Sequence, residues 1–192
     1  MTSPSSPSKP STWRIYFTKR LVIIGLFGFS SGLPLLLTMS TLTWWLANAG
    51  LTKQTIGLFG LATIPYAYKF LWAPFVDRLP LPFLTQKMGR RRSWLLFSQI
   101  ILAASIALMG TVNPIESPAL LFIFSLLVAF WSATQDIVID AYRIQSLTQP
   151  EYAAGAAMEV NGYRLGMMVA GAGALALSDD FRTCLHSLDR KR

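Results

Sequence analysis

Cysteine and histidine are almost missing from this chain of 192 residues. It holds one of each, Cys184 and His186, and both lie close to the end of the sequence. A structural zinc site needs about four ligands, and a disulfide needs two thiols. Ser-His and Cys-His catalysis are nearly excluded for the same reason. The sequence therefore predicts no metal site and no cofactor, so any ionic chemistry has to rest on Asp, Glu, Lys, Arg and Tyr.

Charge is scarce as well, because only 14% of the residues are charged whereas 53% are hydrophobic. Soluble domains carry about 25% charged residues, and a disordered chain combines high charge with low hydrophobicity. The net charge of +8 gathers in short basic clusters between apolar stretches. A nucleic-acid binder would need a continuous basic face. The composition thus predicts a lipid bilayer, and no nucleic acid, as the partner of this chain.

Long uncharged stretches are what the chain has in abundance. A helix needs about 20 apolar residues to cross a bilayer. Such stretches predict spans over residues 21–46, 54–76, 93–112, 118–135 and 153–177. A signal peptide cleaved near Ala49 is an alternative for the first span, but the apolar core of a signal peptide has only about 7–15 residues. We expect an all-α, polytopic transmembrane helix bundle of about five spans.

Three regions follow from this pattern. Residues 1–20 are Ser/Pro-rich and basic, with expected disorder over 2–12; residues 21–178 hold the spans; residues 179–192 form an atypical charged tail. Lys and Arg in short loops mark the cytoplasmic side of a membrane protein. A cytoplasmic N-terminus puts ten of them inside and one outside. That orientation is our prediction, although it places the basic end of the tail outside.

Asp136 and Asp140 are the most informative pair in the sequence. They stand four residues apart on the predicted helix, so their carboxylates share a face. Two close carboxylates repel each other, and burial disfavours the charged form. We expect one of them to hold a proton and to serve transport or proton coupling. The alternative is that both lie at the cytoplasmic helix end, solvated or paired with Arg143.

Lys69 is the single charge within the second predicted span. A lysine at that depth has to reach the interface or face a polar interior. We interpret it as facing a cavity for an anionic substrate or as pairing with an acid on another helix. Reaching the cytoplasmic interface remains the alternative.

The fifth predicted span combines small and charged residues. Gly162 and Gly166 form a G-x-x-x-G pattern, which favours close packing of helices. Glu159 and Arg164 are five residues apart, which is not an ideal spacing for a pair on one helix. Each is therefore expected to find a partner on another helix. With Tyr163 they predict either a polar network in the core or a substrate site.

The loop between the second and third spans begins at Asp77 and Arg78 and ends at Gly89, Arg90, Arg91 and Arg92. An anion at a helix C-terminus is unfavourable, so Asp77 is expected to pair with a cation of this loop. Such a pair could act as a charge lock that stabilises one conformation. A plain cytoplasmic anchor is the alternative.

This loop resembles the cytoplasmic loop motif of the major facilitator superfamily, although Ala73 stands where that motif has Gly. Further strings are similar to the AmpG-type muropeptide permeases of that superfamily. They are Gly28-Phe-Ser-Ser-Gly-Leu-Pro-Leu35, Thr55-Ile-Gly-Leu-Phe, Lys69-Phe-Leu-Trp-Ala-Pro74, Ala133-Thr-Gln-Asp-Ile-Val-Ile-Asp140, Gly155-Ala-Ala and Gly162-Tyr-Arg-Leu-Gly-Met167. The resemblance implies a proton-coupled importer of anhydromuropeptides for peptidoglycan recycling in the bacterial inner membrane.

On this resemblance the substrate and proton pathway holds six residues. They are Lys69, Gln135, Asp136, Asp140, Tyr163 and Arg164. Glu159 and Asn161 depart from the family pattern. The family has two halves of six spans, so the chain resembles an incomplete N-terminal half. We expect a truncated chain that is inactive alone, or one that a separate C-terminal half completes.

Two other functions are compatible with part of this pattern. A related facilitator with another substrate, such as an acetyl-CoA carrier, would have the same fold. A membrane prenyltransferase could use an Asp-x-x-x-Asp pattern, but it needs a second acidic cluster, and the predicted spans contain no second acidic pair. We therefore predict a transporter and not an enzyme.

Overall fold

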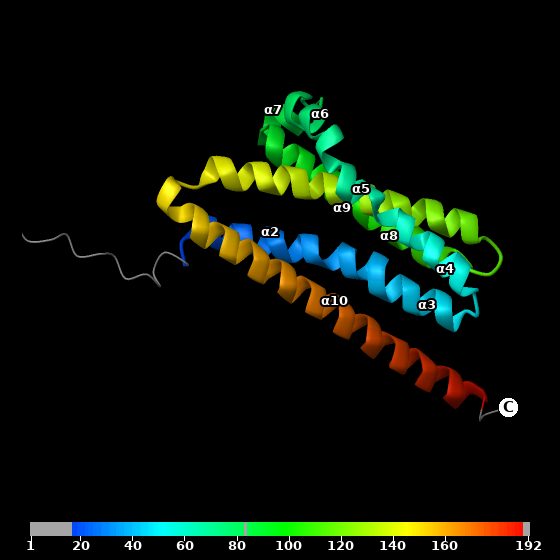
Figure 1. Cartoon of the computed structure of the whole chain (residues 1–192). Coiled ribbons are helices and arrows are strands. Elements are labelled where there is room, and N and C mark those ends of the chain that lie inside the picture. Colours follow the sequence, from blue (N-terminus) through cyan, green and yellow to red (C-terminus); the bar gives the residue numbers. More distant parts are fainter. Residues whose placement is uncertain (1–16, 83, 190–192) are drawn as a thin grey trace, which may run out of the picture.

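The computed structural model describes residues 17–82 and 84–189, and this part of the chain folds into helices without a strand. The long helices run side by side as an elongated bundle (Figure 1). The predicted all-α architecture is therefore confirmed. The expected disorder over residues 2–12 lies outside the described residues.

The first span is one long helix with an irregular middle. It consists of α2 (Lys19–Leu36), the π-helical turn η1 (Leu37–Thr41) and α3 (Leu42–Asn48). Pro34 lies inside α2 and has no backbone N–H to donate. In η1 the Thr38 hydroxyl donates to the carbonyl oxygen of Pro34 over 3.0 Å.

The second predicted span is not a single helix. Five short elements cover it: α4 (Lys53–Phe59), η2 (Gly60–Thr63), α5 (Ile64–Tyr68), η3 (Lys69–Leu71) and α6 (Ala73–Arg78). Pro65 and Pro74 each lie in the first turn of a new α-helical segment, α5 and α6. Because proline lacks a donor, it cannot continue the hydrogen bonding of the preceding turn. The predicted span over 54–76 thus consists of α-helical and 3-10 turns instead of one regular α-helix.

The remaining spans are long helices. After α7 (Leu84–Met88) the chain forms α8 (Arg90–Thr111), α9 (Pro118–Ser146), the turn η4 (Gln149–Glu151) and α10 (Tyr152–Asp189). α9 and α10 both extend beyond the predicted spans. α10 also crosses the boundary that the sequence suggests near residue 178.

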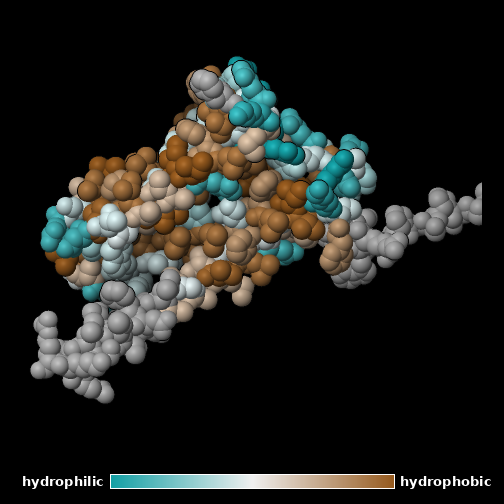
Figure 2. All heavy atoms as spheres, turned by 180° about the vertical axis from the view of Figure 1, so that it is seen from behind, coloured by the Kyte–Doolittle hydropathy of each residue, from teal (hydrophilic) through white to brown (hydrophobic). Residues whose placement is uncertain are grey.

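Three helices in the described part of the chain are long and apolar enough to cross a membrane. They are Lys19–Asn48, Arg90–Thr111 and Pro118–Ser146. Hydrophobic side chains cover much of the face in Figure 2, and hydrophilic ones gather mainly at its two ends and at the top of the view. α10 is not among the three, and its polar turn around Glu159 and Arg164 lowers its hydropathy. The structure is thus that of a membrane-embedded helix bundle.

Glycine residues bring α10 and α2 into close contact along much of their length (Figure 1). A Cβ on Gly162 would collide with the carbonyl oxygen of Gly25, and one on Gly166 with that of Phe29. The reverse holds as well, because a Cβ on Gly28 would collide with the carbonyl oxygen of Glu159. Small residues let two helix backbones approach in this way. This packing fixes the position of Glu159 relative to the first span.

The turn between α9 and α10 is held by its own polar contacts. The Thr148 backbone N–H and hydroxyl both donate to the Glu151 carboxylate, over 3.0 and 2.8 Å. The backbone bond is the main cause that lowers the pKa of Glu151 from its ordinary value. Arg20 at the start of α2 donates to the carbonyl oxygen of Ser146. These contacts hold the ends of three helices together.

Candidate functional site

A pocket of about 200 Å³ opens among the helices and carries most of the charge within the apolar bundle. Its lining consists of Gly28, Ser31, Lys69, Asp136, Asp140, Glu159, Val160 and Tyr163. These residues come from α2, the broken second span, α9 and α10, so the pocket exists only when all four segments pack. Four of the six residues predicted for the substrate and proton pathway line it.

The break in the second span explains how Lys69 reaches the pocket. Lys69 begins η3, the tight turn between α5 and α6. Its ammonium group lies 3.4 Å from a carboxylate oxygen of Asp140 on α9. Lys69 therefore pairs with an acid on another helix, one of the two interpretations that the sequence favoured.

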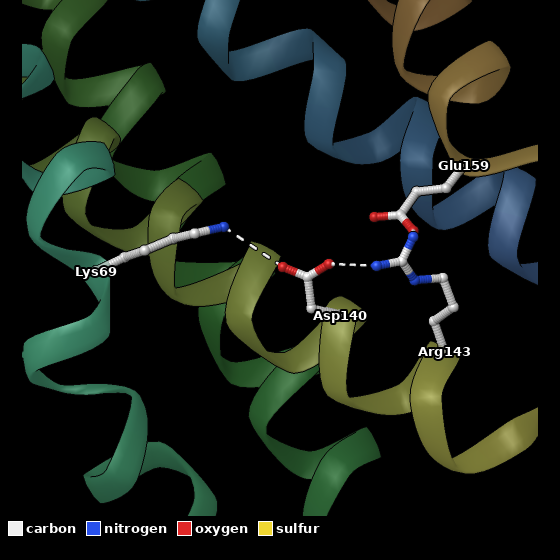
Figure 3. A network of polar contacts seen from close by, with 4 residues as sticks. All are labelled: Lys69, Asp140, Arg143 and Glu159. Carbon is white, nitrogen blue, oxygen red and sulfur yellow. Dashed lines mark hydrogen bonds and ion pairs between the residues drawn. The ribbon is translucent and has the colours of Figure 1, made fainter. Parts of the chain in front are cut away.

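Asp140 is shared between two cations. Its second oxygen accepts a hydrogen bond from the Arg143 guanidinium over 3.2 Å. Arg143 in turn lies 2.9 Å from a carboxylate oxygen of Glu159 on α10. Figure 3 shows the four side chains in a row from Lys69 to Glu159. The row connects three spans through alternating charges.

The charges of this row are only partly shielded. The side chains of Lys69 and Asp140 are 38% and 40% exposed, against 26% and 21% for Arg143 and Glu159. A charge that faces hydrocarbon is costly, so intramembrane charges usually face a bundle interior or a water-filled cavity. Lys69 and Asp140, at the exposed end of the row, therefore have to be covered by water or by further polypeptide.

Gln135 lies behind the pocket and does not line it. The residue is fully buried, and its amide nitrogen donates to the Ser30 hydroxyl over 3.2 Å. Gln99 on α8 donates to the same hydroxyl over 3.3 Å. Ser30 thus joins α2 to α8 and α9 directly beside the pocket.

The structure does not bring Arg164 into the pocket. Its side chain is exposed, and no ion pair joins it to a described residue of the charged row. Tyr163, its neighbour on the helix, does line the pocket. Successive residues of a helix point about 100° apart, which explains why only one of the two can.

Sequence reasoning missed the roles of Arg143, Glu159 and Ser31 in this site. For Arg143 the sequence predicts only an alternative pairing with the two aspartates, and for Glu159 it predicts a partner on another helix without identifying it. The signal for Arg143 was its spacing from Asp140, three residues along one helix. The pairing of Arg143 with Glu159 joins separate helices, so spacing could not predict it.

Among the residues that the structure describes, no group of three or more His, Cys, Asp and Glu side chains is placed to hold a metal ion. Two of the three pocket acids, Asp140 and Glu159, are instead paired with Lys69 and Arg143. The pocket lining offers one ammonium group, three carboxyl groups and the hydroxyl groups of Ser31 and Tyr163.

The loop predicted as a charge lock forms a separate cluster. Arg91 at the start of α8 lies 3.3 Å from a carboxylate oxygen of Asp77 in the last turn of α6. The same guanidinium donates to Gln145 of α9 over 2.6 Å. Gly89 precedes α8 with a φ of 80°, a conformation that favours glycine. Arg78, Arg90 and Arg92 are exposed around it.

Arg91→Ala is expected to lower the free energy of unfolding by about 0.5–1 kcal/mol, since partly exposed ion pairs contribute little. Unfolding of the purified chain in detergent, followed by tryptophan fluorescence, measures this. Arg92→Ala is the matched control, because the structure gives Arg92 no ion-pair partner among the described residues. Equal effects of the two substitutions would contradict a structural role for the Asp77 pair.

Residues 20–117, about half of the chain, match the family described as acetyl-coenzyme A transporter 1. The chain belongs to this transporter family. It is 45% identical over 166 residues to the anhydromuropeptide permease of Escherichia coli K12, with 86% of this chain and 33% of the relative covered. An AmpG-type permease is thus among its relatives, as the sequence motifs predicted.

Two further relatives give the same picture. A transporter of Rickettsia bellii named AmpG 1 is 35% identical over 84% of this chain and 39% of its own length. An uncharacterized protein of Haemophilus influenzae is 39% identical over 84% of this chain and 37% of its own length. The chain therefore spans little more than a third of the length of these relatives.

Proposed function

We propose that the chain forms part of a proton-driven importer of anhydromuropeptides in the bacterial inner membrane. The observation that carries this proposal is the charged pocket inside an otherwise apolar helix bundle. Ionisable groups at membrane depth usually mark routes for ions or substrates. The name of the relative from Escherichia coli supplies the substrate class.

In this proposal Lys69 and Asp140 act as a pair that the substrate opens. An anionic group of the substrate, such as a peptide or sugar-acid carboxylate, would compete with Asp140 for the Lys69 ammonium. Arg164, which lies outside the pocket, is proposed as a second attraction for the anionic substrate along its path. Alternating access of one helix bundle against another would then carry the substrate past the pocket.

The exposure of the pocket supports the view that other helices complete it. Lys69 and Asp140 are more than one-third exposed although they lie among membrane-spanning segments. We propose that a second group of helices, equivalent to the part of the relatives that this chain does not match, covers them. That group could come from a separate chain.

An acetyl-coenzyme A carrier is the second candidate, because the matching family carries that description. Both substrates are anionic, so Lys69 could serve either. The two substrates differ in chemistry: an anhydromuropeptide contains sugar and peptide, whereas acetyl-coenzyme A contains a nucleotide. Competition between the two compounds therefore separates them.

Uptake by spheroplasts of a bacterium that lacks its own permease tests the proposal. The spheroplasts would express this chain, the unmatched part of the Escherichia coli permease, or both. We expect uptake of radiolabelled anhydromuropeptide only with both, and inhibition by unlabelled anhydromuropeptide. Stronger inhibition by acetyl-coenzyme A than by unlabelled anhydromuropeptide would favour the second candidate. Uptake by the chain alone would contradict the need for further helices.

A further inference from the structure

The two aspartates of the pocket lie one helical turn apart on α9 but have different partners. Asp140 accepts contacts from Lys69 over 3.4 Å and from Arg143 over 3.2 Å. Asp136 has no ion pair with any residue that the structure describes. One carboxylate is therefore neutralised by cations on both of its oxygens, and the other is not.

Asp136 is surrounded by groups that offer no direct counter-charge. From the neighbouring elements it faces Ser31 of α2, Tyr66 of α5, Lys69 of η3, Asp140 of its own helix, and Glu159 and Tyr163 of α10. Lys69 is the only cation among them, and Asp140 already holds its ammonium group. The two remaining acids repel an ionised Asp136.

The Ser31 hydroxyl lies beside the carboxyl group of Asp136. Ser31 is 7% exposed and lines the same pocket. Its hydroxyl faces Asp136, yet it makes no hydrogen bond of good geometry to a described residue. A hydroxyl can donate to a carboxylate or accept from a carboxylic acid. It can therefore serve Asp136 in either protonation state.

We propose that Asp136 is the carboxyl group that takes up and releases a proton in this pocket, whereas Asp140 is the shared ion-pair partner of Lys69 and Arg143. With Asp136 protonated, the charges of Lys69, Asp140, Arg143 and Glu159 cancel. Loss of its proton leaves one unbalanced negative charge in an apolar bundle, and such a charge is costly unless it is paired. A proton is the smallest group that can balance it.

Glu159 is a positioning residue, because it holds Arg143 beside Asp140. Its carboxylate holds Arg143 at 2.9 Å, and the close packing of α10 on α2 at Gly28 fixes its backbone. Arg143 is thereby kept beside Asp140 and away from Asp136. The coupling of this proton to transport rests on the proposed function, but the assignment of the proton to Asp136 does not.

Infrared difference spectroscopy of the whole chain in lipid nanodiscs tests the assignment without any transport. The aspartate carboxyl groups are labelled with carbon-13, which separates their C=O stretch from that of Glu159. The sample is titrated between pH 5 and pH 9, roughly the range around neutrality in which a useful coupling group must change its charge. The wild-type chain is expected to show one labelled carboxylic acid band that disappears as the pH rises.

Asp136→Asn is expected to remove this band, and Asp140→Asn is expected to leave it. Asp136→Glu keeps a carboxyl group in place but escapes the aspartate label, so it should move the titrating band to the unlabelled frequency of glutamate. This variant also serves if Asp136→Asn fails to fold. A labelled band that survives in Asp136→Asn and vanishes in Asp140→Asn would overturn the proposal. So would a wild-type chain without any titrating aspartate band.

Discussion

Gly162→Ala is expected to destabilise the chain by about 1–3 kcal/mol, the usual cost of overpacking a tight interface. The new Cβ would meet the carbonyl oxygen of Gly25, which is backbone and cannot swing aside. Relief would require α10 to move away from α2. Such a movement would also carry Glu159 away from Arg143, so the substitution should disturb the charged row.

Gly173→Ala is the matched control on the same helix, because a Cβ there meets nothing within 4 Å. An alanine inside a helix is about 1 kcal/mol more favourable than a glycine, so this variant should be neutral or slightly more stable. Unfolding by titration with a denaturing detergent, followed by circular dichroism, measures both. Equal stability of the two variants would show that α2 and α10 do not pack through these glycines.

Asp140→Asn is expected to have the largest effect on function and a clear effect on stability. It leaves both Lys69 and Arg143 without their shared carboxylate, whereas Lys69→Met leaves Asp140 with Arg143. The pair is partly exposed, so the loss of stability should fall between that of surface and buried pairs, at about 1–3 kcal/mol. Lys69→Met should cost less than about 1 kcal/mol, because a single partly exposed pair is lost.

Uptake and unfolding measured side by side separate the two effects. In spheroplasts that also express the unmatched part of the Escherichia coli permease, Asp140→Asn should reduce uptake to background. Gly173→Ala should retain it. A variant Asp140→Asn with full uptake would exclude the Lys69 pair from the transport pathway, whatever its effect on stability.

The apolar helices could be predicted from the sequence, but the breaks within them could not. An uncharged stretch predicts a span from composition alone, and α8 begins and ends within three residues of the prediction. Pro65 and Pro74 were visible in the second span, but the number of turns that they separate depends on how the segment packs against α9. The turn η3 that presents Lys69 could therefore not be predicted.

The site was predictable where one helix carries its residues. The spacing of Asp136 and Asp140 placed both in the pocket, because four residues make about one helical turn. The ion-pair partners that Asp140 and Glu159 find on other helices could not be predicted, because they depend on how the helices cross. Gly162 and Gly166 fix that crossing through contacts with Gly25 and Phe29, and no pattern within a single span identifies such partners.

Proton-driven uptake into liposomes tests the central claim most directly. Purified chain would be reconstituted with the unmatched part of the Escherichia coli permease, and labelled anhydromuropeptide would be added outside. We predict accumulation when the outside is more acidic than the inside, a return to background after addition of an uncoupler, and no accumulation with Asp140→Asn. Uptake that ignores the proton gradient, or that survives Asp140→Asn, would contradict the account.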